Sequence, residues 1–213
     1  SADQRARLVV LPFEDQSAGG SNRFLAEGLT DELITRVGRV NPGRLVVLAY
    51  GASGPGTGEP RDLKALAHAL AVDWVVEGAI EHLGERIRVS ARLIRAIDRV
   101  PVWAVVEEAS ADGLLTMQDR FAQQIARAVG VSSEVGRMRL TSLHPDAYVE
   151  YLRGLSLWNK RDRLSLEAAA QAFRRSIKLQ DDFAPAWVGL ANTYSVQIDH
   201  GFADTKENWL LAK

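Results

Sequence analysis

The sequence predicts an α/β sandwich domain with a mixed sheet, followed by an all-α region built from helical hairpins. Three observations carry this prediction. Short apolar runs rich in β-branched residues alternate with amphipathic stripes of helical period in the first part of the chain. A stretch of strict period two follows, and a turn sequence divides it into two halves. The last third of the chain returns to helical periodicity.

The start of the chain predicts the order strand, helix, strand, helix. Residues 8–13 form a short apolar run, as expected of a strand that is buried on both faces. A helical stripe follows and closes at Asn41-Pro42-Gly43. Residues 45–50 repeat the buried-strand pattern, and a second helical stripe lies beyond a loop rich in Gly and Pro. The stripes comprise Leu25, Leu29, Leu33, Val37 and Val40 in the first helix and Leu63, Leu66, Ala67 and Leu70 in the second.

The period-two stretch predicts an antiparallel hairpin around Gly84-Glu85. A two-residue loop with Gly in first position fixes the register of both strands, and this register sets opposite charges across from each other on the solvent face. The turn, the apolar face and the charges therefore agree. The predicted pairs are Ile80 with Val89, Gly78 with Ala91 and Val76 with Leu93 on the core face, and Glu81 with Arg88 and Glu77 with Arg92 on the solvent face.

One more strand and one more helix complete the first domain, which we expect to cover residues 1–131. Residues 132–143 are polar and weakly periodic, so they are predicted to be a linker. The all-α region then covers residues 144–213. Pro145 suits the first turn of its first helix, and Ser165 with Glu167 is predicted to cap the next one. The third strand covers 102–106, and the closing helix carries the stripe Leu114, Phe121, Ile125 and Val129.

The composition excludes several classes of function. A net charge of −1 and a pI near 6.4 give no general attraction for nucleic acid or an anionic membrane, so neither is expected as a direct partner. The chain has no cysteine, which removes disulfides, thiolate metal ligands and cysteine nucleophiles and fits both reducing and oxidising compartments. No apolar run reaches the roughly 20 residues of a membrane helix.

No catalytic, cofactor-binding or metal-binding residue is predicted, and the chain is not expected to be an enzyme. Gly51-Ala52-Ser53-Gly54-Pro55 approaches the G-x-S-x-G nucleophile motif, but its fifth position is Pro and more loop follows where the motif needs a helix. The sequence has no Gly-Lys-Ser/Thr phosphate loop. Its four histidines fall in four different predicted elements, without the spacing of a metal site. The arginines of the hairpin face glutamates, which predicts a neutralised surface rather than a phosphate site.

Two residue patterns near the end of the chain are typical of the tetratricopeptide repeat (TPR), a helical hairpin of about 34 residues that stacks on its neighbours. The region resembles one complete repeat followed by one truncated repeat, so we expect the chain to be a fragment of a larger protein. The patterns are Trp187-x-x-Leu190-Ala191-x-x-Tyr194 and, before it, the series Ala169, Phe173, Ser176 and Asp181.

The truncated repeat is expected to leave Trp187, Leu190 and Tyr194 partly uncovered, because a TPR hairpin buries its apolar face only against the next one. An exposed apolar patch of this kind is an association site. The prediction is therefore a homodimer through the uncapped end, or a fold-back of the residues near Trp209 onto this patch.

Helical hairpins of this kind bind other chains and carry no chemistry. The expected partner is a protein or an adjacent domain of the parent chain. The candidate binding residues are Leu155 and Trp158 in the complete repeat and Asn192 and Ser195 in the truncated one. Exposed aromatic side chains are enriched at binding hot spots, and Asn192 supplies a hydrogen-bond donor. The tryptophans expected in packed positions are Trp74, Trp103 and Trp187.

Several segments of the chain are similar to the TolB N-terminal-like (FlgO-like) domain, which precedes TPR arrays in many bacterial regulators. These segments are residues 8–15 (LVVLPFED), 26–34 (AEGLTDELI), 75–80 with 88–94, Val102-Trp103-Ala104, 117–120 (MQDR) and Ile125-Ala126. The sequence departs from the family pattern at Glu107-Glu108-Ala109, where an aromatic residue and Asp are usual.

The resemblance implies a bacterial protein in which the module follows a winged-helix DNA-binding domain, a class III nucleotide cyclase domain or a Ser/Thr kinase domain. It implies no catalytic residue. The location would be cytoplasmic, or periplasmic if the parent has a membrane helix upstream. The leading prediction is a non-catalytic regulatory and protein-interaction module. The alternative is a small-molecule sensor with its ligand near the Gly-rich loop 51–60, where open α/β sheets often place pockets.

Overall fold

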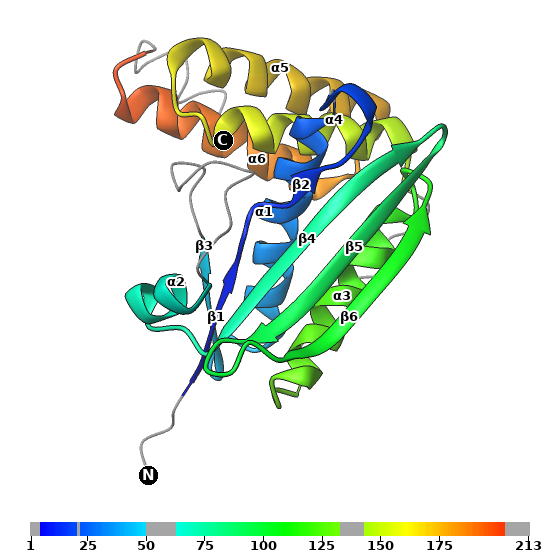
Figure 1. Ribbon diagram of the computed structural model, residues 1–213. Coiled ribbons are helices and arrows are strands. Elements are labelled where there is room, and N and C mark those ends of the chain that lie inside the picture. The colour runs from blue at the N-terminus through cyan, green and yellow to red at the C-terminus, as the bar shows by residue number, and fades with distance from the viewer. Residues whose placement is uncertain (1–4, 21, 50–62, 133–142, 203–213) are drawn as a thin grey trace. The chain divides into compact units, whose positions relative to one another are not determined.

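The computed structural model describes residues 5–20, 22–49, 63–132 and 143–202. It divides into two compact units, residues 1–139 and 140–213. The first unit is a mixed α/β structure, and its order of strand, helix, strand, helix, three strands and helix confirms the sequence prediction (Figure 1). A two-residue strand, β2, was not predicted. The elements of the first unit are β1 Ala6–Val10, β2 Glu14–Asp15, η1 Ala18–Gly20, α1 Arg23–Val40, β3 Leu45–Ala49, α2 Leu63–Leu70, β4 Trp74–Leu83, β5 Arg86–Arg95, β6 Pro101–Ala109 and α3 Leu114–Ala128.

The six strands form one mixed sheet in the order β3, β1, β4, β5, β6, with β2 also paired to β4. Strand β1 runs parallel to β3 and β4, whereas β4, β5 and β6 are antiparallel. Beyond β1 the chain continues along β4, because Leu11 N donates to Val76 O at 2.8 Å and Gln16 N donates to Ile80 O at 2.8 Å. Pro12 has no N–H to give to this ladder, so β1 and β2 are separated by an interruption.

The hairpin between β4 and β5 has the predicted register, including all five predicted pairs. Gly84 has φ +64° and Glu85 keeps a negative φ, which is the backbone of a two-residue turn with Gly first. Arg88 contacts Glu81 at 2.9 Å and Arg92 contacts Glu77, both on the predicted face. At Gly78 an added Cβ would lie 2.5 Å from Ser90 O, so this position accepts only glycine without a shift of the backbone.

Helices α1 and α3 pack on one face of the sheet, which Figure 1 shows from the opposite side. The predicted stripe of α1 is buried, with Leu25, Leu29, Leu33 and Val37 at most 2% exposed. Burial of each such side chain contributes about 1.5 to 3 kcal/mol, so this stripe explains why the helix docks on the sheet. From α3, Phe121 packs edge-on against the half-buried Trp103 of β6, with ring centroids 5.7 Å apart.

Polar contacts also join α1 to α3. Arg36 of α1 pairs with Glu32 one turn earlier at 2.6 Å and with Asp119 of α3. Gln118 Nε2 of α3 donates to the backbone O of Leu29 at 2.9 Å. Arg36 and Glu32 are buried, so this ion pair lies inside the helix layer, where charges need partners.

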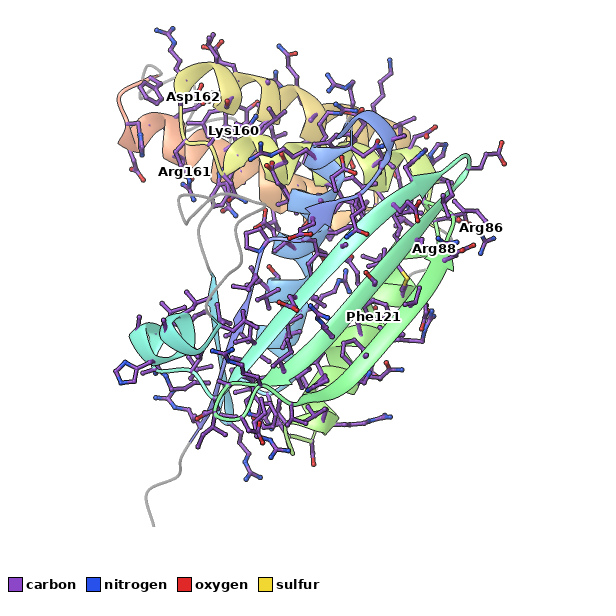
Figure 2. The ribbon with its side chains drawn as sticks, in the orientation of Figure 1. Arg86, Arg88, Phe121, Lys160, Arg161 and Asp162 are labelled. Atoms are coloured by element: carbon purple, nitrogen blue, oxygen red, sulfur yellow. The ribbon has the colours of Figure 1, made fainter. Side chains whose placement is uncertain are left out.

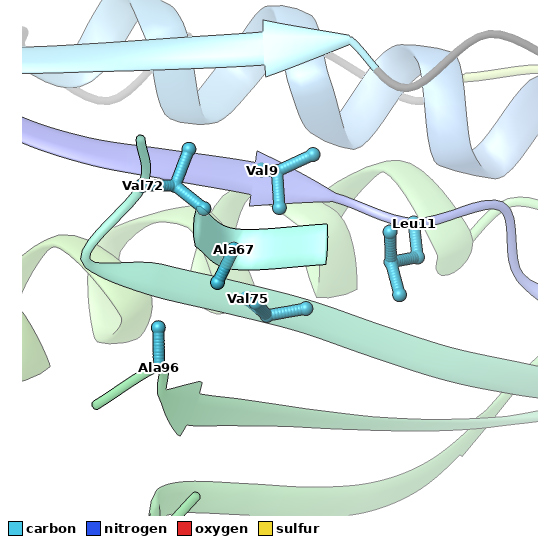
Figure 3. Packing of buried hydrophobic residues seen from close by; sticks show 6 residues of the cluster. All are labelled: Val9, Leu11, Ala67, Val72, Val75 and Ala96. Carbon is cyan, nitrogen blue, oxygen red and sulfur yellow. The ribbon is translucent and has the colours of Figure 1, made fainter. Parts of the chain in front are cut away.

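Helix α2 covers part of the opposite face of the sheet, near β1 and the start of β4. Figure 3 shows the buried cluster there, which Leu48, Leu63, Leu66 and Leu70 extend as partly buried neighbours. Within the described part of the first unit, the rest of this face, over β4, β5 and β6, carries no helix (Figure 1). We call this area the open face. The cluster consists of Val9, Leu11, Ala67, Val72, Val75 and Ala96.

The described part of the second unit is all-α, with three helices that each contact the other two. The side chain of Phe173 is fully buried and lies directly against two glycines, since a Cβ on Gly154 or on Gly189 would be 2.5 Å from its ring. Tyr151 and Phe183 pack edge-on at 5.2 Å in the same aromatic core. The helices are α4 Pro145–Trp158, α5 Arg163–Leu179 and α6 Ala184–Asp199.

Three expectations for the second unit are wrong. The cap of α5 is Asp162, whose carboxylate accepts from Ser165 N at 2.9 Å, so Ser165 already lies in the first turn. Hydrogen bonds from Ser165 lower the pKa of Asp162. Trp187 is 51% exposed, which contradicts its expected packed position but agrees with the expectation of a partly uncovered end. Leu190 and Tyr194 are buried, which contradicts that second expectation. The physical reason is that the packing face of α6 runs through Ala186, Gly189, Leu190, Thr193, Tyr194 and Gln197, which leaves Trp187 to one side.

Candidate functional site

Candidate residues for reaction chemistry are those that the structure describes. No group of three or more His, Asp or Glu side chains there could hold a metal ion. Ser53 and the Gly-rich loop 51–60 lie outside the described residues, as does Trp209. None of the described helices has the length and apolar character needed to cross a membrane. Two candidate sites lie among the described residues: one on the helices of the second unit and one on the open face of the sheet.

On α4, the predicted residues Leu155 and Trp158 lie one turn apart and are both half-buried. The guanidinium of Arg161 stacks 3.6 Å from the centre of the Trp158 ring, at the turn into α5 (Figure 2 labels Arg161). The indole Nε1 of Trp158 is buried without a hydrogen-bond partner among the described residues. Arg161 has φ +58°, a conformation that non-glycine residues rarely adopt, so the turn holds its side chain over the indole at some cost in backbone strain.

On α6, the predicted residues Asn192 and Ser195 are exposed, and they also lie one turn apart. The hydroxyl of Ser195 donates to the backbone O of Ala191 at 3.1 Å, which leaves its oxygen free to accept from a partner. The structure thus groups the four predicted residues as two pairs, one on each helix.

Sequence reasoning missed Val188, whereas it expected Trp187 to be partly uncovered at the truncated end. Val188 is 56% exposed and Trp187 is 51% exposed, next to Asn192 on the helix. The indole N–H of Trp187 donates to Asp181 O at 2.8 Å, which fixes the ring at the start of α6. We call Trp187, Val188, Asn192 and Ser195 the α6 outer face. The signal for Val188 was its place directly beside Trp187 in the repeat pattern, off the packing positions.

The open face of the sheet holds the second candidate site, a cavity of about 540 Å³. It crosses β4, β5 and β6 and is bounded by the segment around β2 and by the first residue of α2. Each strand that it crosses contributes at least one small residue to the lining, and β4 and β5 also contribute the charged side chains of Glu77 and Arg92. The lining residues are Pro12, Glu14, Gln16, Leu63, Glu77, Gly78, Ala79, Ser90, Ala91, Arg92, Ala104, Val105 and Val106.

Paired charges flank this cavity on the open face. Arg88 lies between Glu81 and Glu108, at 2.9 and 2.8 Å, and Figure 2 labels it beside Arg86. The hydrogen bond to Glu108 and the charges of both glutamates raise the pKa of Arg88. The expectation that the hairpin arginines face glutamates is confirmed for Arg88 and Arg92, so most of this surface is neutralised.

The runner-up prediction placed a ligand near the loop 51–60. That loop lies outside the described residues, but Leu63, three positions beyond it, lines the cavity. The cavity was not visible in the sequence, because it depends on which small residues become neighbours across three strands.

Comparison with known proteins gives one bacterial relative and several distant structures. No family model matches the chain. The protein named "Putative adenylate cyclase 3" from Rhizobium meliloti (strain 1021) is 25% identical over 188 residues, which are 86% of this chain and 32% of that protein. The chain therefore spans about a third of the length of this relative.

Among solved structures, TolB from Acinetobacter baumannii superposes with a TM-score of 0.45 and 15% identity, over 62% of this chain and 30% of TolB. Lipoprotein GNA1162 from Neisseria meningitidis superposes with a TM-score of 0.42 and 17% identity, over 57% of this chain and 96% of the lipoprotein. The C-terminal domain of LpoB from Salmonella enterica superposes with a TM-score of 0.41 and 12% identity, over 50% of this chain and 84% of the LpoB chain. TolB, whose N-terminal domain the sequence motifs resemble, is thus among the structural neighbours.

Proposed function

We propose that this chain is a non-catalytic regulatory and protein-interaction module of a larger bacterial signalling or transcriptional regulator. The match to the Rhizobium meliloti relative carries this proposal, because it covers 86% of this chain but only 32% of a protein whose name assigns it to nucleotide cyclisation. A region shared in this way, and without a metal-binding group in its described part, suits an accessory role beside a separate catalytic domain.

We further propose that the helices of the second unit are TPR hairpins. Phe173 of α5 packs against Gly154 of α4 and Gly189 of α6, so the middle helix is held between its two neighbours. Ser176 Oγ of α5 donates to the backbone O of Ala147 at 2.7 Å inside the same core. Stacked hairpins of this type present an extended surface for other chains, which is their usual role.

The α6 outer face is the surface proposed to bind the protein partner. It combines two large, exposed apolar side chains, Trp187 and Val188, with the polar groups of Asn192 and Ser195. Tryptophan is enriched at binding hot spots because it offers a large contact area at a small entropic cost. Leu155 and Trp158 on α4 are proposed as a second, weaker part of the contact.

A site-specific photo-cross-linker tests this assignment. It would replace Val188 in the full-length parent protein, with Leu164 as the matched control because that residue of α5 is also apolar and 76% exposed. We expect position 188 to give one defined protein adduct, or an adduct with another domain of the parent, that is lost when Asn192→Lys and Ser195→Lys are added. Equal adducts from positions 188 and 164 would mean that α6 has no special role.

The non-catalytic part of the proposal has a separate test. The purified chain, incubated with ATP and Mg²⁺, is expected to form no cyclic AMP. Reproducible formation of cyclic AMP by this chain, lost on heat unfolding, would overturn the reading.

The cavity on the open face favours a second candidate function, a small-molecule sensor. Its volume of about 540 Å³ lies within the range of 300 to 1,000 Å³ that ligand pockets usually have. A thermal-shift screen with a metabolite library tests this candidate, because a ligand at a hundredfold its Kd adds about 2.7 kcal/mol to the free energy of unfolding. A library without any stabilising compound would speak against a sensor.

A further inference from the structure

Among the described residues that line the cavity on the open face, one is cationic, Arg92, and its side chain is held in a fixed orientation. Arg92 of β5 contacts Glu77 of β4 through two nitrogens, Nε and Nη2, and both contacts go to the same oxygen, Oε1. Glu77 is directly opposite Arg92 in the register and its side chain is only 20% exposed, so it cannot swing away easily. The glutamate therefore orients the guanidinium plane.

The remaining edge of this guanidinium is available to a ligand. Nη1 of Arg92 makes no hydrogen bond within the part of the chain that the structure describes, and the side chain is 61% exposed. A guanidinium has five N–H donors in a planar fork, and its Nη1 and Nη2 edge matches the two oxygens of a carboxylate. Arg88, on the same strand and the same face, differs because both Glu81 and Glu108 engage it.

The apolar residues of the lining indicate which kind of ligand body the cavity would favour. The lining also contains apolar residues, namely Pro12, Leu63, Ala79, Ala104 and Val106. A ligand with an apolar body would gain from covering them, at about 25 cal/mol for each Å² removed from water.

The acidic residues in the lining limit the charge of the ligand. Glu14 is exposed and lines the same cavity as Glu77, so the described lining already holds two acidic side chains besides Arg92. A ligand with a second negative charge would be repelled, whereas a neutral hydrogen-bond donor could approach Glu14 and Gln16. The volume of the cavity suits a free small molecule better than the end of a folded chain.

We propose that this cavity binds a free monocarboxylate with an apolar body, and that the Nη1 and Nη2 edge of Arg92 receives the carboxylate. The proposal rests on the second candidate function, the sensor, and names the class of its ligand. Arg92 is then a specificity-determining residue and Glu77 a positioning residue.

The test uses N-acetyl-leucine as the probe and N-acetyl-leucinamide as its neutral analogue, with chemical-shift changes in ¹⁵N-labelled chain as the readout. We expect the acid to shift the amide signals of β4, β5 and β6 around the cavity and the amide analogue to bind about tenfold or more weakly, since a charge-assisted hydrogen bond is lost. Arg92→Lys should weaken binding of the acid about as much, because a lysine cannot form the bidentate contact. Arg88→Lys, the matched control, should leave the affinity unchanged.

Ala104→Leu provides a second variant that fills the cavity from an exposed position and should abolish binding with an unchanged circular dichroism spectrum. Equal affinity for the acid and the amide, or equal effects of the two arginine variants, would overturn the proposal. Tighter binding of Gly-Gly-Gly-Leu than of N-acetyl-leucine would replace the small molecule by a peptide C-terminus. Library compounds without a carboxylate that shift the same signals would overturn the ligand class but keep the sensor, and no shift from any compound would overturn both.

Discussion

At the scale of single residues, the buried ion pair between α1 and α3 is the most consequential polar contact. Arg36 and Glu32 have side chains that are 7% and 6% exposed, and Asp119 completes the cluster from α3. A buried charge is tolerated only with a partner, because the interior cannot replace the water it has lost. The cluster therefore fixes which helices face each other more than it adds to the stability.

Removal of Arg36 should be costly. Arg36→Ala leaves the buried carboxylate of Glu32 without its cation, and we expect the free energy of unfolding to fall by about 3 to 5 kcal/mol in urea titrations. Arg23→Ala is the matched control, since Arg23 pairs with Glu27 on the same helix at the same spacing but is 73% exposed. That variant should change stability by no more than about 0.5 kcal/mol. Similar losses for the two variants would contradict the account of the buried pair.

Asp15 gives the chain a predictable dependence on acid. It accepts hydrogen bonds from Ser17 N and Asn22 N, both at 2.9 Å, and so ties the end of β2 to the start of α1. Partial burial acts to raise the pKa of its carboxyl, but the hydrogen bonds from Ser17 and Asn22 together outweigh it, and the pKa is lowered from its ordinary value of 3.8. The ionised Asp15 therefore contributes its full stabilisation of the fold above pH 3.8. This stabilisation is lost as the pH falls through the lowered pKa that Asp15 has in the folded chain.

Asp15→Ala should accordingly destabilise the first unit by about 1 to 2 kcal/mol at neutral pH, because hydrogen bonds to a charged group are lost. The difference from the unmodified chain should shrink as the pH falls below 3.8 and through the lowered folded pKa of Asp15. Unfolding titrations over this pH range measure it, with Glu14→Ala, at the neighbouring exposed position, as a control expected to change little. A difference that stayed constant with pH would show that the charge of Asp15 is not what stabilises the loop.

At the scale of elements, glycines decide how closely the helices of the second unit approach. An added methyl group at Gly154 would lie 2.5 Å from the ring of Phe173, and this ring cannot retreat because Gly189 lies equally close to it. Replacing a glycine inside a helix by alanine normally stabilises it by about 1 kcal/mol. Here the overpacking, which typically costs about 1 to 3 kcal/mol, opposes that gain.

Gly154→Ala should thus destabilise the second unit rather than stabilise it. Thermal unfolding followed by circular dichroism measures the shift in Tm. Ser195→Ala is the control for an exposed helix position without such a contact, and it should leave the Tm nearly unchanged. A higher Tm for Gly154→Ala would mean that Phe173 can move and that the helices are less closely packed than described.

How far the elements could be predicted depends on whether their signals are local. The hairpin of β4 and β5 was predictable pair by pair, because Gly84 sets the turn and the side chains on both strands repeat with period two. Strand β2 was not predictable, since its two residues carry no periodicity. They pair only because the chain continues along β4. The cap of α5 was misplaced because Asp162 and Ser165 are both good caps in sequence, and only the backbone decides between them.

The candidate sites were predictable only in part for the same reason. Asn192 and Ser195 are exposed on one side of α6, which helical periodicity alone suggests. The uncapped end was expected to expose Trp187, Leu190 and Tyr194 alike, but only Trp187 is exposed, because the packing face of α6 includes Leu190 and Tyr194 and passes Trp187 by. The cavity is lined by residues as far apart in the sequence as Glu14 and Val106, and no short-range pattern indicates that they share one cavity.

At the scale of the whole molecule, the chain consists of two compact units, each with its own buried core. The core of the first unit lies between the sheet and the helices α1, α2 and α3, and that of the second is the aromatic cluster around Phe173. This division suits a module in which one unit supports a sheet with a cavity and the other presents helices.

The division into two units predicts that a destabilising substitution in one unit leaves the stability of the other unit unchanged. Arg36→Ala should speed amide hydrogen exchange in α1 and α3 and leave α4, α5 and α6 unchanged, whereas Gly154→Ala should do the reverse. Mass spectrometry of exchanged peptides resolves the two sets of helices. Faster exchange throughout the chain in either variant would show that the two units unfold as one.

The central claim, that the α6 outer face is a binding surface, is tested most directly by ¹⁹F NMR of chains labelled with fluorotryptophan. Trp187 is 51% exposed, and Trp187→Phe identifies its signal by loss. A soluble paramagnetic quencher should broaden this signal in the isolated chain. In the full-length parent, alone or with its partner, the account predicts that the signal shifts and is protected from the quencher. A signal of Trp187 that stays equally accessible in the isolated chain, in the parent and in every complex of the parent would contradict the claim.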